Sequence, residues 1–279
     1  MIPLSRPDLT QADRDAVARV LRTPTLSLGP RVPEFETRLA RWLGVKYAVA
    51  VANGTAGLHL CVRALDLARG DEVITTPFSF VASSNVILYE GARPVFVDID
   101  EESLNLDVKA IPAAISSRAR AVLPVHVFGL PCEIGEVMKL ARKHGLRVVE
   151  DSCEAIGATF RGRRVGTFGE SAVFAFYPNK QMTTGEGGII VSNEKELADL
   201  FRSLRNQGRP ADGGWLEHPR MGYNYRLDEM SAALGGSQVT RLDGMLRLRT
   251  QVAARYHELL ADVPGVRTLG CPAPMTRSW

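Results

Sequence analysis

The feature that most constrains this fold is the alternation of short apolar segments with amphipathic ones. The apolar segments are rich in Val, Ile and Ala and have few polar breaks, which is typical of strands covered on both faces. The segments between them repeat apolar residues at helical spacing. Helices that cross over between such strands imply an α/β fold with a mostly parallel central sheet flanked by helices. The expected strands span 46–51, 72–76, 94–98, 120–125 and 146–150.

The pattern changes after residue 151. Two further strands, at 171–176 and 187–191, are separated by a loop and not by a helix, so we expect one of them to run antiparallel. The chain then approaches another strand near Trp279. The expected helices span 11–22, Pro33 to a cap at Gly44, 55–68, 79–89, 107–115, 133–144, 194–206 and 228–261.

Length, net charge and cysteine content limit the kinds of protein that this chain can be. A chain of 279 residues can bury a large core, and we expect a large domain over 1–240 and the start of a smaller, incomplete one over 241–279. A net charge of +3 is too small to indicate a nucleic-acid or membrane partner. Four dispersed cysteines without metal-ligand spacing indicate free thiols and no metal site. With no apolar run of about 18 residues and no signal core, we expect a cytoplasmic protein.

A single lysine, Lys180, follows an apolar strand and a Pro-containing turn, and a loop of small residues follows it. A lysine held against a strand end with little bulk around it can lose its proton, and only the neutral amine attacks a carbonyl. The alternative is a surface lysine in a loop, where most lysines lie.

Other groups end neighbouring strands, where ligands bind in an open parallel sheet. Asn53-Gly54-Thr55 opens a helix and offers backbone N–H groups and a hydroxyl to an anion, although a plain helix cap explains it better when taken alone. Asp151 ends the strand at 146–150. It could cap the next turn or pair with a ligand cation such as a protonated pyridine nitrogen.

Two aromatic side chains follow further strands. Phe80 could stack on a flat ring or belong to the core, and His126 is interpreted as a hydrogen-bonded structural histidine without a catalytic role. Together, the sheet edge offers an anion cradle, an aromatic side chain, a carboxylate and a lysine. This set matches pyridoxal 5′-phosphate, which needs donors for its phosphate, a stacking face, an acid at its ring nitrogen and a lysine at its aldehyde.

Short motifs occur in a fixed order along the chain: Leu28-Gly29-Pro30 through Phe35-Glu36, Asn53-Gly54-Thr55, Glu150-Asp151 with Ala155 and Gly157, Tyr177-Pro178-Asn179-Lys180, Gly185-Glu186-Gly187-Gly188, Arg205-Asn206-Gln207-Gly208 and Gly222-Tyr223-Asn224-Tyr225-Arg226. With them the chain resembles, from Pro3 to its end, the DegT/DnrJ/StrS family of pyridoxal-phosphate sugar aminotransferases. Members of that family share the fold type I, aspartate-aminotransferase architecture.

The resemblance implies pyridoxal 5′-phosphate as the cofactor. It implies that Lys180 links covalently to the cofactor and moves protons, and that Asp151 is the partner of the pyridine nitrogen. It further implies that Gly54 and Thr55 bind the phosphate and that Phe80 stacks on the ring.

The resemblance also implies a homodimer with shared sites. Asn224, and less surely Arg226, resemble residues that family members contribute to the cofactor phosphate of the neighbouring subunit. Without the resemblance, these two residues would be interpreted as a polar turn.

Three departures from the family pattern stand out. Ala175 replaces a serine that helps many relatives hold the phosphate. Glu154 stands where many relatives have Gln or His near the ring hydroxyl, so we expect this cofactor-binding position to be either protonated or turned aside. Relatives are also longer, with a C-terminal small domain that is truncated here.

The sequence therefore predicts an aminotransferase that converts a nucleotide-linked keto-deoxysugar to an aminosugar, with glutamate as the amino donor. One alternative is a sugar dehydratase of the same family, but those relatives place histidine where Lys180 stands. Another is a non-catalytic regulatory or binding protein that keeps the fold.

Overall fold

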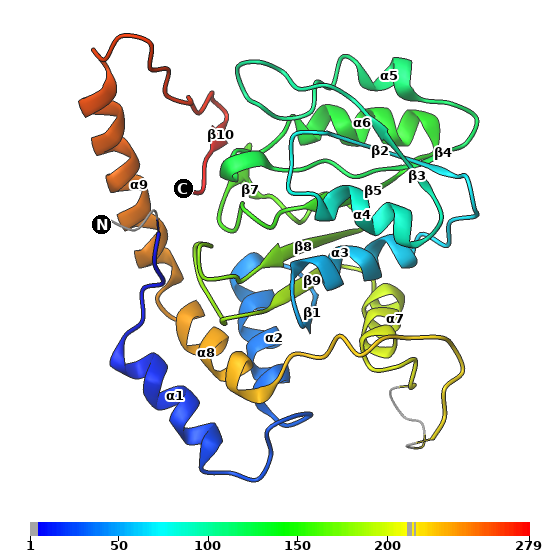
Figure 1. The fold of residues 1–279 in the computed structure, drawn as a ribbon, viewed down its shortest axis with the longest axis vertical. Coiled ribbons are helices and arrows are strands. Elements are labelled where there is room, and N and C mark those ends of the chain that lie inside the picture. Colours follow the sequence, from blue (N-terminus) through cyan, green and yellow to red (C-terminus); the bar gives the residue numbers. More distant parts are fainter. Residues whose placement is uncertain (1–4, 211–213, 215) are drawn as a thin grey trace.

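A central sheet organises the molecule (Figure 1). The structure is a computed structural model that describes residues 5–210, 214 and 216–279, so Pro3, where the resemblance begins, lies outside the described residues. Within these ranges the sheet has seven strands in the order β1-β9-β8-β5-β4-β2-β3. The strands are β1 (Tyr47–Val51), β2 (Glu72–Thr75), β3 (Arg93–Phe96), β4 (Ala119–Val122), β5 (Arg147–Asp151), β8 (Ser171–Ala175) and β9 (Gly188–Ser192).

The predicted direction change falls at β9. This strand pairs antiparallel with both β1 and β8, whereas the other pairings in the sheet, from β8 through β5, β4 and β2 to β3, are parallel. The prediction of a mostly parallel sheet with one antiparallel strand is therefore confirmed. Because β8 and β9 are neighbours joined by a hairpin-like loop, residues 176–187 remain at the end of the sheet where β8 finishes.

Helices cover both faces of the sheet. They are α1 (Gln11–Leu21), α2 (Arg31–Leu43), α3 (Gly54–Arg63), α4 (Ala82–Tyr89), α5 (Ile111–Ala114), α6 (Ile134–His144), α7 (Lys195–Arg205), α8 (Glu229–Val239) and α9 (Leu242–Leu260), with a 3₁₀ turn, η1 (Val127–Gly129). None of the helices in the described part of the chain is long and apolar enough to cross a membrane.

Side-chain alternation in β1 separates the two faces. Val49 and Val51 pack in the cluster that contains α3, α4 and α7, whereas Ala48 and Ala50 pack in the cluster that contains α2 and α8. A third cluster joins α5 and α6 to Ile74 on the β2 side. Burying each large aliphatic side chain contributes roughly 1.5–3 kcal/mol, so these three clusters account for most of the stabilisation of the layers.

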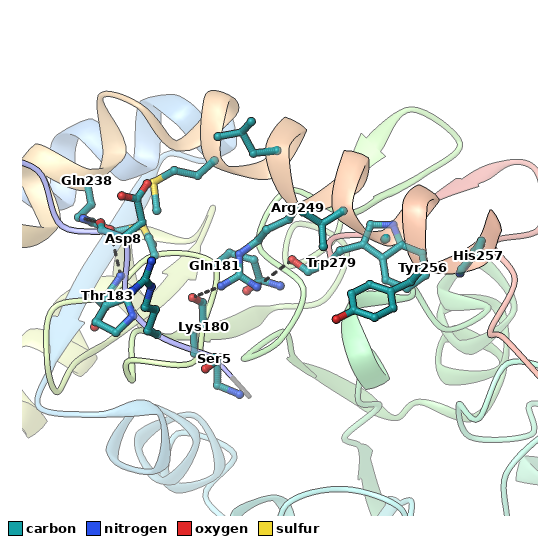
Figure 2. A pocket seen from close by; sticks show the side chains of 17 residues that line it. Ser5, Asp8, Lys180, Gln181, Thr183, Gln238, Arg249, Tyr256, His257 and Trp279 are labelled. Atoms are coloured by element: carbon teal, nitrogen blue, oxygen red, sulfur yellow. Dashed lines mark hydrogen bonds between the residues drawn. The ribbon is translucent and has the colours of Figure 1, made fainter. Parts of the chain in front are cut away.

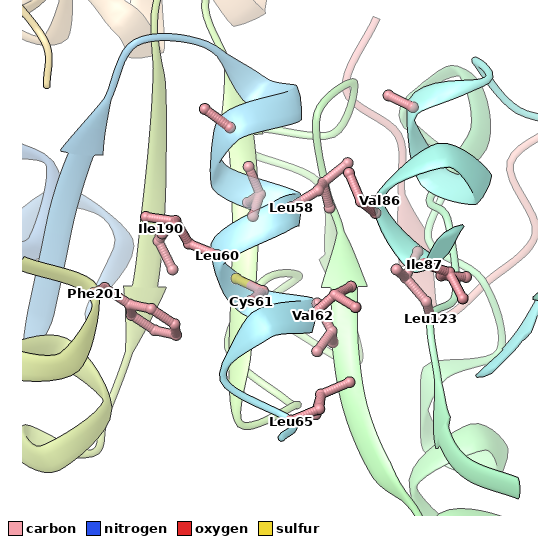
Figure 3. Packing of buried hydrophobic residues seen from close by; sticks show 14 of the residues in the cluster. Leu58, Leu60, Cys61, Val62, Leu65, Val86, Ile87, Leu123, Ile190 and Phe201 are labelled. Atoms are coloured by element: carbon pink, nitrogen blue, oxygen red, sulfur yellow. The ribbon is translucent and has the colours of Figure 1, made fainter. Parts of the chain in front are cut away.

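Helix α3 is buried nearly all round, and Figure 3 shows why. Leu60 faces Ile190 of β9 and Phe201 of α7, while Leu58 lies toward Val86 of α4. A helix with apolar side chains on all sides needs neighbours on all sides. Its position is therefore fixed, which matters because its N-terminus borders a cavity of about 1040 Å³.

Several predicted boundaries are wrong. The helix expected over 228–261 is two helices, α8 and α9, interrupted at Arg241, whose guanidinium pairs with Asp8 and Asp13. The helix expected over 107–115 contracts to α5, and the helix expected from 79 begins at Ala82. The helix expected over 55–68 ends at Arg63.

The sequence also gave no signal for a small second sheet. Its strands are β6 (Thr159–Phe160), β7 (Arg163–Arg164) and β10 (Met275–Thr276), in the order β10-β6-β7. The strand expected near the end of the chain is thus the short β10, which pairs antiparallel with β6. The division at residue 240 into two domains stays a prediction.

Candidate active site

A cavity of about 1040 Å³ opens at the carboxyl ends of the parallel strands. Segments that follow β1, β2, β4, β5 and β8 all contribute to its wall. The residues predicted from the sequence that line it are Gly54, Thr55, Phe80, Asp151, Glu154 and Lys180. The general rule for open α/β sheets therefore holds here.

The N-terminus of α3 forms one end of the cavity. Asn53 caps the helix, with Oδ1 accepting the N–H of Ala56 at 2.8 Å. The N–H groups of Gly54 and Thr55 precede that bond in the first turn, where a helix provides no partner four residues back. A side chain at position 54 would place its Cβ 2.8 Å from the Cβ of Ala175. The glycine therefore lets the helix end approach β8 closely, and the positive end of the helix dipole faces the cavity.

The adjacent carboxylates Glu150 and Asp151 have different surroundings because successive strand residues point to opposite faces. Glu150 is fully buried; it accepts hydrogen bonds from the His126 ring and from the backbone N–H groups of Gly166, Phe168 and Gly169. Burial alone would raise the pKa of Glu150, but His126 and these N–H groups hold that pKa below its ordinary value. Glu150 and His126 thus have structural roles, as predicted for His126.

Asp151 faces the cavity instead. Its Oδ2 accepts a hydrogen bond from Ser83 Oγ at 2.8 Å, and its Oδ1 accepts the N–H of Cys153 at 3.1 Å. Ser83 in turn contacts Ser79 Oγ at 2.8 Å. Within the described residues, this buried carboxylate has two neutral donors and no cation among its hydrogen-bond partners, so it is suited to receive a positive group from a ligand.

Lys180 lies in the loop between β8 and β9, and its side chain is only 18% exposed. Its Nζ is 3.2 Å from Glu154 Oε1. The second carboxylate oxygen of Glu154 accepts the N–H of Phe128, whose backbone is left-handed at φ 49°. The carboxylate of Glu154 therefore reaches the lysine and is held there by a backbone donor, and the expectation that Glu154 is either protonated or turned aside stays a prediction.

Aromatic side chains gather at the cavity mouth. Phe80 follows β2 and is 78% exposed, and Phe128 and Tyr177 are also exposed. Phe78 packs edge-on against Phe128, with ring centroids 5.9 Å apart. The alternative that Phe80 belongs to the core is excluded by its exposure.

The main chain of Lys180 borders a second cavity, of about 610 Å³, between α9 and residues 5–8 (Figure 2). Arg249 on α9 donates from Nη2 to the Lys180 carbonyl at 2.9 Å and from Nη1 to the Trp279 carbonyl at 3.3 Å. Gln181 donates to the Glu154 carbonyl at 2.6 Å. Hydrogen bonds to the Lys180 carbonyl and from the Gln181 side chain therefore hold this segment in place.

Among the lining residues that were not predicted from the sequence are His59 and Tyr225, whereas Asn224 and Arg226, predicted to serve a neighbouring subunit, do not line this cavity. His59 and Tyr225 line the cavity, and the spacing of His59 four residues after Thr55 could have placed it on the same helix face. Asn224 is exposed and does not line the cavity of its own chain, while Arg226 donates to Asn206 Oδ1 at 3.1 Å.

Comparison with known proteins matches this chain to one family of aminotransferases. Residues 7–279 match the model of the DegT/DnrJ/EryC1/StrS aminotransferase family. A GDP-perosamine synthase from Caulobacter vibrioides is 41% identical over 262 residues, covering 93% of this chain and 70% of that protein. Among solved structures, the Helicobacter pylori aminotransferase PseC, involved in pseudaminic acid biosynthesis, is 35% identical with a TM-score of 0.90, covering 94% of this chain and 71% of that one. The aminotransferase TlmJ from Streptoalloteichus hindustanus is 34% identical with a TM-score of 0.95, covering 100% and 76%.

Proposed function

This chain belongs to the DegT/DnrJ/EryC1/StrS aminotransferase family, and from that premise we propose that it transfers an amino group from glutamate to a nucleotide-linked keto-deoxysugar, using pyridoxal 5′-phosphate. The observation that carries the proposal is the convergence of Lys180, Asp151 and the N-terminus of α3 on one cavity. The names of the relatives support a sugar as the acceptor.

The residues present fit this cofactor. The first turn of α3 offers unpaired N–H groups and the Thr55 hydroxyl to a phosphate. Asp151 offers a buried carboxylate whose hydrogen-bond partners are neutral. Lys180 offers a mostly buried amine, and Phe80 an exposed ring at the mouth. We assign Gly54 and Thr55 to the phosphate, Asp151 to the ring nitrogen, Phe80 to the ring face and Lys180 to the aldehyde carbon.

When bound, the cofactor supplies an electron sink and the carbon that carries nitrogen between the two substrates. Lys180 would hold the cofactor through its Nζ, and its free amine would be the base that accepts and returns a proton at the α-carbon of the amino donor. Asp151 would pair with the protonated ring nitrogen, and this pairing would stabilise the negative charge that develops during proton removal.

Glu154 holds the amine of the freed lysine in place. Its Oε1 accepts a hydrogen bond from Lys180 Nζ, and the N–H of Phe128 holds its other oxygen. An ammonium that has just accepted a proton therefore meets a carboxylate at hydrogen-bond distance. The ion pair also holds Nζ in place between the two half-reactions.

A second subunit is part of the proposal. Asn224 is exposed and lies outside its own cavity, so its amide is available to the site of a neighbouring protomer. The exposed aromatic side chains at the cavity mouth are surfaces that an adjoining protomer would cover. We therefore propose a homodimer in which Asn224, with Arg226 beside it, completes the partner's phosphate site.

Borohydride reduction tests the assignment of Lys180. The wild-type protein incubated with pyridoxal 5′-phosphate should retain one cofactor per chain, trapped on the Lys180 peptide, and Lys180→Ala should trap none and show no turnover. The matched control is Lys139→Ala, which removes an exposed ammonium paired with Glu136 on α6 and should behave as wild type. Retained turnover in Lys180→Ala would overturn the lysine assignment. Failure of the wild type to aminate any nucleotide-linked ketosugar would overturn the substrate class.

A further inference from the structure

A row of side chains behind the anion cradle connects a buried carboxylate to the cavity. Glu90 Oε1 lies 2.9 Å from His59 Nε2, and His59 Nδ1 lies 3.1 Å from the hydroxyl of Tyr225. Arg63 donates to the other oxygen of Glu90 at 3.0 Å. His59 and Tyr225 both line the cavity, while the Glu90 side chain is almost completely buried.

The Glu90 carboxylate determines which ring nitrogen of His59 carries a hydrogen. Because Glu90 is paired with Arg63, it accepts hydrogen bonds, and His59 Nε2 must carry a hydrogen. With a neutral imidazole, Nδ1 is then an acceptor and takes the hydroxyl hydrogen of Tyr225. With a protonated imidazole, Nδ1–H donates to the Tyr225 oxygen, and the hydroxyl hydrogen is free to turn into the cavity.

The row formed by Glu90, His59 and Tyr225 lies at the end of the cavity that the N-terminus of α3 forms. Thr55 and His59 are four residues apart and therefore share one face of α3. The backbone of Tyr225 is fixed nearby, since its carbonyl accepts the N–H of Ala52, immediately before the helix cap. The Tyr225 hydroxyl thus belongs to the same wall as the first turn of α3.

Residues from α3, from the end of α4 and from the segment before α8 pack around His59. Glu90 and the Tyr89 ring come from the end of α4, and Arg63 comes from the next turn of α3. The rings of Tyr223 and Tyr225 lie 4.8 and 5.8 Å from the imidazole by centroid and stack on each other. Glu90 is the one carboxylate among these neighbours in the described residues, so the protonated imidazole has a stabilising partner.

We propose that Tyr225 is a hydroxyl donor to the phosphate bound at the N-terminus of α3, and that His59 and Glu90 position that hydroxyl. The inference rests on the proposed cofactor and deepens it by adding a side-chain hydroxyl donor from Tyr225, which lines the same cavity.

A hydrogen-bond donor must keep its proton, and the surroundings of the Tyr225 hydroxyl favour this. Burial raises the pKa of Tyr225 above its ordinary value, and Tyr89 and Glu90 raise it further. Tyr225 therefore keeps its proton at neutral pH and can donate it in a hydrogen bond.

Affinity measurements with two ligands test the assignment. Pyridoxal 5′-phosphate and pyridoxal, which lacks the phosphate, are titrated against the wild type and Tyr225→Phe. The variant should bind the phosphorylated ligand roughly tenfold to a hundredfold more weakly, as expected for a lost hydrogen bond to a charge, and should bind pyridoxal within about twofold of wild type. Tyr47→Phe is the matched control, because Tyr47 lies at the start of β1 and does not line the cavity, and it should bind both ligands like the wild type.

A second variant separates positioning from packing. His59→Gln should weaken the binding of pyridoxal 5′-phosphate and leave the binding of pyridoxal within about twofold of wild type, because the imidazole orients the hydroxyl that meets the phosphate. The loss should not grow when His59→Gln is combined with Tyr225→Phe, since both substitutions remove the same oriented hydroxyl.

Several results would overturn the inference. Equal affinity of Tyr225→Phe and wild type for pyridoxal 5′-phosphate would exclude Tyr225 as a donor. An equal loss for both ligands would indicate a packing role, and additive losses in the double variant would exclude His59 as the positioning group. A wild-type protein that binds neither ligand would reject the proposed cofactor itself, which is distinguishable from each of these outcomes.

Discussion

Replacing Glu150 with glutamine should destabilise the fold strongly, although the substitution conserves shape. Oε1 of Glu150 accepts the N–H groups of Phe168 and Gly169 at 2.7 and 2.8 Å. Oε2 accepts the N–H of Gly166 at 2.8 Å and contacts His126 Nε2 at 3.1 Å. Both oxygens of the carboxylate are therefore used by two donors each.

The size of the effect follows from this geometry. An amide has one oxygen and one NH₂ group, so in either orientation the NH₂ group faces two of the donors. Each buried donor left without an acceptor costs roughly 1–3 kcal/mol, which gives about 2–6 kcal/mol for Glu150→Gln. Neighbouring Asp151 would move with this end of β5, so cofactor affinity should fall as well.

Urea unfolding at pH 7, followed by intrinsic tryptophan fluorescence, measures the change. The matched control is Glu170→Gln, because Glu170 pairs with Arg147 at a half-exposed site and should contribute less than about 1 kcal/mol. If Glu150→Gln lost no more stability than Glu170→Gln, the account of the buried carboxylate would be refuted.

Lowering the pH should reduce the stability of the wild type and of Glu150→Gln by different amounts. Because the folded pKa of Glu150 lies below its ordinary value of 4.5, its contribution to stability is present above about pH 4.5 and is lost as the pH falls toward the folded pKa. The wild type should therefore lose more stability than Glu150→Gln on acidification below pH 4.5. A parallel loss in both proteins would contradict the assignment of the proton-linked stability to this residue.

Two further predictions concern stability and use the same unfolding assay. Gly54→Ala should destabilise the fold by about 1–3 kcal/mol, because its Cβ would lie 2.8 Å from that of Ala175, whereas Gly236→Ala in α8 has nothing within 4 Å and should be neutral or stabilising by up to about 1 kcal/mol. Glu229→Gln should cost about 1–3 kcal/mol, because Glu229 accepts the N–H groups of the first two residues of α2 through its two oxygens. The control is Glu34→Gln, which removes an exposed ion pair and should cost under about 1 kcal/mol. Equal effects in either matched pair would contradict the corresponding contact.

The sequence predicted those parts of the fold that depend on local pattern. Apolar runs defined the strands, and the expected cap at Gly44 is confirmed by its left-handed φ of 79°. Lys180, Asp151 and Thr55 could be placed together because the carboxyl ends of parallel strands share one edge of a sheet. Their proximity therefore followed from topology and not from the spacing of these residues in the chain.

What could not be predicted depends on contacts between distant segments. The break before α9 is associated with ion pairs of Arg241 with Asp8 and Asp13, more than 220 residues away. The direction of the Glu154 side chain depends on the N–H of Phe128, which belongs to the segment after β4. The contact of His59 with Tyr225 joins residues 166 positions apart. No local periodicity carries information about such pairs.

The guanidinium of Arg249 has a consequence for protein engineering. It bonds to the carbonyls of Lys180 and Trp279, so one side chain outside the main cavity links three segments that are remote in sequence (Figure 2). Substitutions at position 249, or neighbouring changes that rotate α9, would alter the reach of the amine without touching any ligand. A mutational library intended to change the reactivity of this enzyme should therefore extend beyond the residues that face its substrates and include the helix behind the lysine.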